Sequence, residues 1–344
     1  MSDVVRFGIV GAGAIAEAYA EALEQSEGVC LSAVADTVTD AAERLASRSG
    51  ATAFGSHETL AESGLCDAVI VATPPATHEA VVLDIIGQGL PVLCEKPFAI
   101  NGVSARRMAS AAREQGVLIS MASKFRYVDD VQTAHELVTA GKIGEIKLIE
   151  NVFTGVVDMT QRWNARADVS GGGVLVDNGT HSVDIVRFFA GNIAAVSARV
   201  GPRLQDIGVE DHVYLSARGD NDALAQVETS WSLHKDRSDY LAIYGTEGAI
   251  ELGWKQSRMR RPLTGQWETF GTGYGKVAAF SGQVLDFAAG VRGEPTKSLP
   301  TIEDIIASVD VISAGYTSIA EDGRWVDVDG VATIDRVLPK RVVS

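Results

Sequence analysis

The sequence predicts an α/β protein with two sheets. The N-terminal part is expected to form a doubly wound parallel sheet, and the C-terminal part an α+β domain with a large, mostly antiparallel open sheet. Three observations predict this class. Short apolar runs alternate with helical stretches as far as residue 123, a pattern typical of parallel strands covered by helices on both faces. Beyond it the strand-like segments are longer and alternate between apolar and polar residues, as half-buried antiparallel strands do. A chain of 344 residues is also long for a single core. We therefore expect two domains, 1–123 and 124–344.

Each strand of the first domain is predicted from an apolar run, because parallel strands are buried on both faces. The helices between them are predicted from apolar residues at helical spacing, as in 15–26 and 38–49. The expected strands are 6–10, 31–35, 68–72, 92–94 and 118–121.

The second domain is predicted to begin with a helix over 130–140 and a turn at 141–144, which contains two glycines. Apolar and polar residues then alternate in several segments, which indicates strands with one buried face. The expected strands are 146–153, 213–217, 225–232 and 240–244, and the expected helices are 175–189 and 302–320.

The net charge restricts the partners of the chain. Acidic residues outnumber basic ones by 45 to 30, which gives a formal charge of -15 that repels nucleic-acid phosphates and anionic lipids. We therefore expect neither nucleic acid nor a membrane as a partner. The charge does not exclude a dinucleotide, because backbone N–H groups at a helix N-terminus hold a pyrophosphate without a cationic side chain.

Cysteine usage and the N-terminal sequence indicate a cytoplasmic protein. Cys30, Cys66 and Cys94 are widely spaced and odd in number, so we expect neither a disulfide framework nor a metal site. The chain passes from Met1 into an apolar strand without a basic leader. No later apolar run reaches the roughly 18 residues of a membrane span.

A glycine motif between the first strand and the first helix predicts a dinucleotide site. Gly11 permits a tight turn, Gly13 lets the backbone approach a pyrophosphate, and Ala16 allows close packing of helix on strand. Glycines also occur in ordinary turns, but this motif follows a predicted strand and opens a predicted helix. We expect Ala14 and Ile15, in the first helical turn, to contact the cofactor as well.

Asp36 predicts that the dinucleotide is NAD. It ends the second strand and lies 23 residues beyond Gly13 (36 minus 13), near the offset of an acid that binds the adenosine ribose. A 2'-phosphate would bring like charges together at this point, so NADP is disfavoured. We expect the neighbouring Thr37 to share the contact.

The loops after two further strands are the next candidates, because ligands of a doubly wound sheet collect beyond the carboxyl ends of its strands. Thr73, Pro74 and His78 follow the third predicted strand, and Glu95 and Lys96 follow the fourth. All five are candidate cofactor contacts, although for His78 packing against the next helix is favoured over reaction. Lys96 is expected to direct its ammonium into the cofactor cleft; a solvated surface lysine is the alternative.

A glycine-rich turn in the second domain leads into a helix with a polar face. Gly171, Gly172 and Gly173 are followed by Asp177 and His181, four residues apart, a spacing that places both on one side of the helix. Such a face is too polar for a simple core stripe, which favours a functional site over a structural one.

Together these motifs resemble the glucose-fructose oxidoreductase, inositol dehydrogenase and rhizopine catabolism (Gfo/Idh/MocA) family over nearly the whole chain. The resemblance implies a Rossmann domain, a second domain with an open antiparallel sheet, and dimers or tetramers that assemble through this sheet. It also implies that Lys96, Asp177 and His181 form a catalytic group. The chain departs from the family pattern at Lys124, where asparagine is frequent. The motifs that carry the resemblance also include Gly141, Gly144, Gly179, Asp184 and the segment 244–248.

The expected activity is oxidation of a secondary alcohol of a sugar or cyclitol with NAD as hydride acceptor. His181 is assigned as general base because the reaction needs a base with a pKa near neutrality, and histidine is the side chain whose ordinary pKa meets this need. Lys96 would stabilise developing alkoxide charge, and Asp177 would accept a hydrogen bond from the substrate. Which of Lys96 and His181 finally holds the proton is left open.

Three further residues are predicted to contact the substrate. Arg162 and Trp163 offer a hydrogen-bond donor and an aromatic face for a sugar-like ring, and a plain surface loop is the alternative. Arg126 is a candidate in the segment that begins at Lys124. His234, Lys235 and Arg237 would recognise an anionic substituent or are simply solvated.

Two other classes of function are compatible with these motifs. One is a glycosidase or lyase that oxidises a sugar transiently and retains its NAD. The other is a non-catalytic NAD-binding regulator, which need not keep all three residues of the group that Lys96, Asp177 and His181 form.

Overall fold

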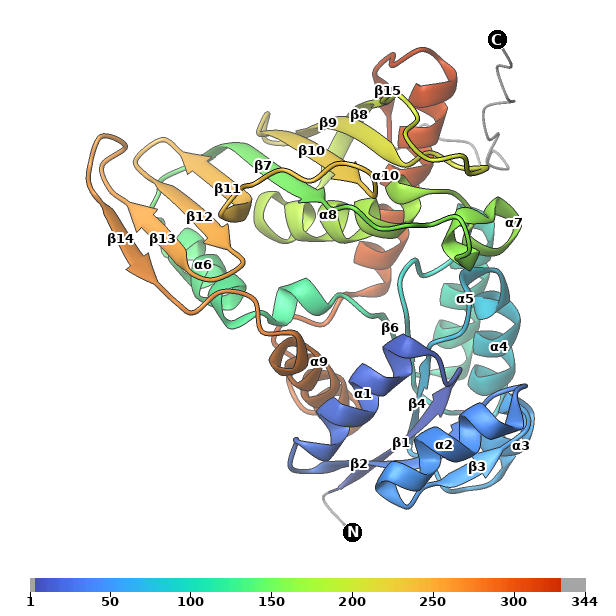
Figure 1. Ribbon diagram of the computed structural model, residues 1–344. Helices are drawn as coiled ribbons and strands as arrows, with labels where there is room; N and C mark the ends of the chain where they lie inside the picture. Colours follow the sequence, from blue (N-terminus) through green and yellow to red (C-terminus); the bar gives the residue numbers. More distant parts are fainter. Residues whose placement is uncertain (1–3, 329–344) are drawn as a thin grey trace. The chain divides into compact units, whose positions relative to one another are not determined.

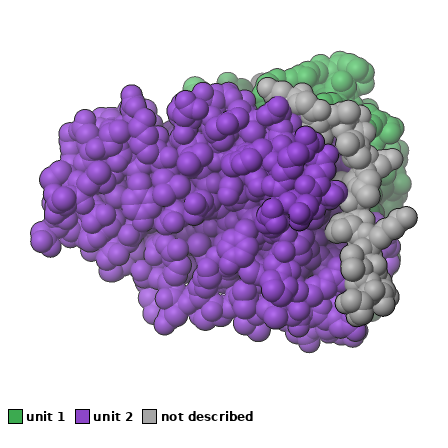
Figure 2. Space-filling view, turned by 90° about the horizontal axis from the view of Figure 1, so that it is seen from above, with its two compact units in different colours: residues 1–99, 103–127, 275–305 green, residues 100–102, 128–274, 306–344 purple. Residues whose placement is uncertain are grey.

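The computed structural model describes residues 4–328 and divides into two compact units. Among the described residues, the first unit contains 4–99, 103–127 and 275–305, and the second contains 100–102, 128–274 and 306–328. Figure 2 colours the two units separately. Each unit contains a sheet of its own.

The first unit contains a six-stranded, fully parallel sheet with the strand order β3-β2-β1-β4-β5-β6. This order is that of the Rossmann fold, so the predicted doubly wound sheet is confirmed (Figure 1). The strands are β1 (Val5–Val10), β2 (Val29–Ala35), β3 (Thr52–Phe54), β4 (Ala68–Val71), β5 (Val92–Cys94) and β6 (Ile119–Met121). The connecting helices are α1 (Ala14–Glu24), α2 (Thr39–Ser49), α3 (His57–Glu62), α4 (Pro75–Gly87) and α5 (Gly102–Gln115), and the 3-10 helix η1 (Lys124–Tyr127) follows β6.

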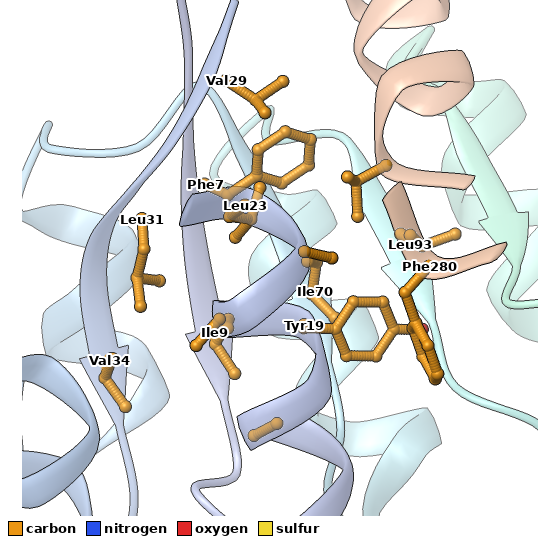
Figure 3. Packing of buried hydrophobic residues seen from close by; sticks show 14 of the residues in the cluster. Phe7, Ile9, Tyr19, Leu23, Val29, Leu31, Val34, Ile70, Leu93 and Phe280 are labelled. Atoms are coloured by element: carbon orange, nitrogen blue, oxygen red, sulfur yellow. The ribbon is translucent and has the colours of Figure 1, made fainter. Parts of the chain in front are cut away.

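The core of the first unit includes a helix that lies late in the sequence. Helix α9 (Lys276–Val291) packs on α1, where the rings of Tyr19 and Phe280 meet edge to face with centroids 4.8 Å apart. The Phe287 ring packs near that of Phe7 of β1, with centroids 6.3 Å apart and the ring planes tilted by 46°. Figure 3 shows Tyr19 and Phe280 beside the strand residues of this core.

The compact units therefore differ from the sequence-based boundary at residue 124. Phe280, Val284 and Phe287 are fully buried, and the apolar surface they cover belongs to α1 and the parallel sheet. Burial of apolar area, and not order along the chain, decides to which core a helix belongs.

The second unit contains a nine-stranded sheet with the order β14-β13-β12-β11-β7-β10-β9-β8-β15. Strands β7 and β10 are parallel, and the other neighbouring pairs are antiparallel, as the mostly antiparallel prediction requires. The predicted strands correspond to β7 (Ile146–Thr154), β9 (His212–Gly219), β10 (Leu224–Ser230) and β11 (Asp239–Gly245). Strands that were not predicted are β8 (Ile193–Val200), β12 (Ala249–Gly253), β13 (Ser257–Arg260), β14 (Trp267–Phe270) and β15 (Val326–Asp327).

Among residues 4–328, helices cover one face of this sheet and leave side chains on the other face exposed. Helix α8 (Val174–Ala190) packs on β7, β9 and β10, and α10 (Ile302–Ala320) is joined to β8 by a hydrogen bond from the N–H of Ala198 to Ser318 Oγ, 2.9 Å. Along β9 the residues alternate, so that Val213 and Leu215 are buried while Tyr214 is exposed. The remaining helices of the second unit are α6 (Asp129–Thr139), α7 (Ala167–Ser170) and the 3-10 helix η2 (Trp163–Ala165).

A search of the helices within residues 4–328 finds none with the length and apolar character needed to cross a membrane.

Candidate functional site

The glycine loop after β1 has the geometry that a dinucleotide site requires. Gly11 has a φ of 95°, and a Cβ there would lie 2.7 Å from the carbonyl oxygen of Ala72, so only glycine fits. Gly13 precedes α1, and a Cβ at this position would meet nothing within 4 Å. No side chain caps the N-terminus of α1, which carries partial positive charge. The loop thus offers an open, positively polarised helix end to a pyrophosphate.

Asp36 lies at the carboxyl end of β2 and is bonded to this loop. Its Oδ2 accepts a hydrogen bond from the N–H of Ala12 at 2.7 Å, and its Oδ1 accepts one from the N–H of Val38 at 2.8 Å. Each carboxylate oxygen can accept a second hydrogen bond, so ribose hydroxyls have acceptors available. Thr37 is exposed beside it.

His78 connects the two loops that were predicted to line the cofactor. Its Nε2 lies 2.8 Å from the carbonyl oxygen of Thr73, and its Nδ1 lies 3.1 Å from the carbonyl oxygen of Pro97. The ring is fully buried, and burial lowers its pKa. The contacts are those of a residue that packs and holds loops, the reading favoured from the sequence. Thr73 is half-buried, and Pro74 is the N-cap residue of α4.

Glu95 and Lys96 follow the carboxyl end of β5, and Glu95 belongs to a buried hydrogen-bond network. Its Oε1 accepts from the hydroxyl of Tyr19 at 2.8 Å, and this hydroxyl in turn accepts from Gln283 Nε2 at 2.9 Å. Its Oε2 accepts the backbone N–H of Lys96 at 3.0 Å. Burial raises the pKa of Glu95, an effect that the ammonium groups of Lys96 and Lys124 oppose. Lys96 itself is half-buried.

The 3-10 helix η1 places Lys124 and Arg126 in the first unit. Lys124 Nζ lies 5.5 Å from the centroid of the Phe280 ring, which gives the lysine an aromatic contact from α9. Arg126 is only 4 % exposed and donates to the carbonyl oxygen of Ser298 at 3.4 Å, with the carboxylate of Asp304 at 3.7 Å. A substrate contact by Arg126 stays a prediction.

Helix α8 carries the other part of the predicted catalytic group. Asp177 and His181 lie one turn apart and are half-buried, and Asp184 is buried. The N–H of Asp177 donates to the carbonyl oxygen of Gly173 at 3.1 Å. Asp177 and His181 thus share one helix of the second unit, while Lys96 lies in the first unit.

The predicted substrate loop of the second unit is exposed but anchored. Arg162 and Trp163 are exposed, and Gln205 holds the preceding chain: its Oε1 accepts the N–H of Met159 at 2.9 Å and its Nε2 donates to the carbonyl oxygen of Val157 at 2.9 Å. Trp163 therefore follows a segment whose backbone Gln205 anchors by hydrogen bonds.

The basic residues after β10 are engaged with carboxylates. Lys235 pairs with Glu228, and Arg237 Nη2 lies 2.7 Å from Asp239 Oδ2. His234 is exposed. Both Lys235 and Arg237 are therefore paired with carboxylates of the same unit. Recognition of an anion by this turn stays a prediction.

Several residues around the candidate site carry no local sequence signal. Tyr19 and Gln283 support Glu95, and Glu210 and Tyr316 contact the start of α8. Each joins segments that are far apart in the chain, so neither spacing nor periodicity could have revealed them.

The parallel sheet, its glycine loop and the residues beyond its strands define a protein that binds a dinucleotide in a Rossmann fold. Residues 5–123 match the oxidoreductase family with an NAD-binding Rossmann fold, and residues 131–251 match the C-terminal domain of the Gfo/Idh/MocA proteins. The chain belongs to the Gfo/Idh/MocA family of oxidoreductases, as the motifs had indicated.

Named relatives extend over nearly the whole chain. The rhizopine catabolism protein MocA of Rhizobium meliloti is 27% identical over 333 residues, which cover 92% of this chain and 96% of that protein. An inositol 2-dehydrogenase of Rhizobium meliloti (strain 1021) is 23% identical and covers 92% and 97%. Levoglucosan dehydrogenase, in a complex with NADH and levoglucosan, shares the fold with a TM-score of 0.86 at 21% identity, over 96% of this chain and 100% of that one.

Proposed function

We propose that this oxidoreductase is an NAD-dependent dehydrogenase that oxidises a secondary alcohol of a sugar or cyclitol. The observation that carries the proposal is the pair of Asp177 and His181 on one face of α8, a base and a hydrogen-bond acceptor for a hydroxyl group. The relatives support the substrate class, because one is named for inositol and another was crystallised with levoglucosan.

NAD is the proposed cofactor because Asp36 presents a carboxylate where NADP would bring its 2'-phosphate. The residues of the first unit fit this dinucleotide: Gly13 leaves open space before α1, and Asp36 retains acceptor capacity beside the loop. Glu95 and the Thr73 loop would lie toward the nicotinamide, since they follow β5 and β4.

In the proposed reaction His181 removes the hydroxyl proton of the substrate as general base. Asp177 accepts a hydrogen bond from the substrate and orients it, and the Lys96 ammonium stabilises negative charge as it develops on the oxygen. The nicotinamide, when bound, supplies the hydride acceptor. This mechanism requires Lys96 of the first unit and the α8 pair of the second to act on one substrate, which is part of the proposal.

Arg162 and Trp163 are proposed to hold the ring of the substrate by hydrogen bonding and by aromatic contact. We also propose a cytoplasmic homodimer or homotetramer that assembles through the uncovered face of the nine-stranded sheet. Tyr214 and Leu224 lie on this face and are both 48% exposed, so a second copy of the chain would bury apolar surface there.

The decisive experiment is a screen of inositols and aldoses for reduction of NAD, followed by absorbance of NADH. We expect NADH to accumulate with at least one polyol in the wild type. Cleavage or elimination of a sugar without net NADH would instead indicate an enzyme that retains its NAD. Binding of NAD with no turnover of any polyol would indicate a regulator.

A further inference from the structure

The start of helix α8 is held by a single buried carboxylate from the segment before β9. Glu210 Oε1 accepts the N–H groups of Gly173 at 3.0 Å and of Leu175 at 3.2 Å. The backbone carbonyl oxygen of Glu210 accepts the N–H of Val174 at 2.9 Å. Three successive N–H groups that a helix leaves without intrahelical partners are therefore bound by one residue.

Tyr316 of α10 completes this arrangement. Its hydroxyl donates to Glu210 Oε1 at 2.6 Å and also lies 3.2 Å from the N–H of Gly173. The Glu210–Tyr316 pair thus links α10, the segment before β9 and the first turn of α8 through one oxygen atom.

The glycines of the turn are required by the Glu210–Tyr316 pair. A Cβ at Gly173 would lie 2.1 Å from the carbonyl oxygen of Glu210, and a Cβ at Gly172 would lie 2.1 Å from the hydroxyl of Tyr316. These distances are far below van der Waals contact. Gly172 and Gly173 of the glycine-rich turn therefore have a structural cause: they let Glu210 and Tyr316 approach the helix end.

Glu210 is only 5% exposed at this point. Burial raises its pKa, while the hydrogen bonds from Tyr316 and from the helix N–H groups oppose that effect. A carboxylate at a helix N-terminus also interacts favourably with the helix dipole. Its Oε1 accepts the hydrogen bonds of Gly173, Leu175 and Tyr316.

We infer that the Glu210–Tyr316 pair positions the face of α8 that carries Asp177 and His181, and that Glu210 is the principal positioning residue. Asp177 closes the first helical turn onto Gly173, the residue that Glu210 binds, and His181 follows one turn later. A shift of the helix start would displace both side chains together. The inference rests on the proposed function, because the displacement matters for the roles assigned there to Asp177 and His181.

Four variants test the inference: Glu210→Ala, Glu210→Gln, Tyr316→Phe and the control Asp130→Asn. Asp130 is a matched control because its carboxylate is buried in the same unit and also accepts two backbone N–H groups, those of Thr272 at 3.1 Å and Gly273 at 2.9 Å. Steady-state kcat and KM, thermal unfolding and hydrogen exchange of the backbone amides of residues 173–175 are measured for each full-length protein.

We expect Glu210→Ala to lower kcat by about 10- to 100-fold, as displacement of catalytic groups by ~1 Å does, while KM for NAD stays within about twofold. Glu210→Gln keeps an acceptor oxygen and should restore most of the activity, and Tyr316→Phe should cause a smaller loss. Asp130→Asn should leave kcat nearly unchanged. Amide protection at 173–175 should fall most in Glu210→Ala and less in Tyr316→Phe, and should stay at the wild-type level in Asp130→Asn.

The inference is overturned if folded Glu210→Ala keeps the kcat of the wild type, or if Asp130→Asn loses as much activity at equal thermal stability. Should Glu210→Ala fail to fold, the test rests on Glu210→Gln and Tyr316→Phe. The inference would be contradicted if both variants keep the amide protection of the wild type at 173–175 while their kcat values differ from that of the wild type. Should no polyol reduce NAD, the proposed function fails separately, and unchanged amide exchange in Glu210→Ala would then overturn the role of Glu210 at the helix start.

Discussion

At the scale of single residues, Asp36 combines a structural role with a proposed role in recognition of the cofactor. One lone pair of each carboxylate oxygen binds a backbone N–H, that of Ala12 or that of Val38, which fixes the carboxylate beside the glycine loop. Each oxygen can accept a second hydrogen bond, as the proposed contact with ribose hydroxyls requires. In the proposed function the same oxygen atoms would hold the loop and select the cofactor.

Replacement of Asp36 by Asn should weaken the preference for NAD over NADP. The amide oxygen can still accept the N–H of Ala12, but the charge that repels a 2'-phosphate is gone. We expect the ratio of kcat/KM with NAD to kcat/KM with NADP to fall by about 10-fold or more. Thr37→Ala, which keeps the charge, serves as control. A wild type that uses NADP as well as NAD would contradict the prediction.

His181→Ala should lower kcat by about 100-fold or more, because a positioned general base contributes 10²- to 10⁴-fold. The Kd for NAD, measured by fluorescence titration, should stay nearly unchanged. His57→Ala is the control, since His57 lies in the first unit with its Nε2 2.9 Å from Asp84 Oδ2. Near-wild-type kcat in His181→Ala would remove the assignment of His181 as base.

At the scale of elements, a bidentate ion pair joins β1 to the start of its neighbour β4 in the parallel sheet. Arg6 of β1 donates from Nε and Nη2 to the two carboxylate oxygens of Asp67, at 3.0 and 2.7 Å, and its backbone N–H donates to Asp67 Oδ2 at 2.8 Å. Asp67 immediately precedes β4. The pair therefore fixes the register of β4 against β1.

The hydrogen bond from Arg6 lowers the pKa of Asp67 from its ordinary value of 3.8. Because the folded-state pKa is the lower one, the stabilisation is present above the unfolded pKa and is lost as the pH falls through the folded pKa. The melting temperature of the wild type should exceed that of Asp67→Asn above about pH 4, and the gap should close at lower pH. Differential scanning fluorimetry from neutral to acid pH measures it.

Arg6→Gln provides the second arm of this test. It removes the same ion pair from the other side, so its melting temperature should show the same reduced pH dependence, and the double variant should add little. If the difference in melting temperature between the wild type and Asp67→Asn widens toward acid pH, the ion pair does not stabilise the fold through a charged Asp67.

At the scale of the whole molecule, the net charge of -15 and the exposed sheet face determine which partners are possible. The charge opposes binding to polyanions. The uncovered face of the nine-stranded sheet, in contrast, exposes Tyr214 of β9 and Leu224 of β10. A second copy of the chain is the occupant we propose for this face.

Leu224→Arg should therefore shift the protein toward monomer, because it places a charge in the proposed interface. Leu285→Arg is the matched control, since Leu285 is 37% exposed on α9 of the first unit. Size-exclusion chromatography with light scattering should give a dimer or tetramer for the wild type and for Leu285→Arg. A monomeric wild type at micromolar concentration would contradict the assembly proposal.

The sequence by itself determined the features whose residues are close together in the chain. The glycine loop with Asp36, the buried strands of the first sheet, and the helix that carries Asp177 and His181 all follow from local spacing and periodicity, because strand and helix geometry fix which neighbours share a face. The short strands β12 to β15 have too few residues for such a pattern, and they are placed by pairing with their neighbours.

Only the tertiary structure decided which distant segments support these features. Helix α9 completes the core of the first unit although it follows the second sheet in sequence, and Tyr19 and Gln283, which are 264 residues apart, share a hydrogen bond. Gly173 and Tyr316 are 143 residues apart, yet their contact explains the glycine-rich turn before α8. Contacts of this kind are selected by burial and hydrogen bonding in the folded chain, which leave no period in the sequence.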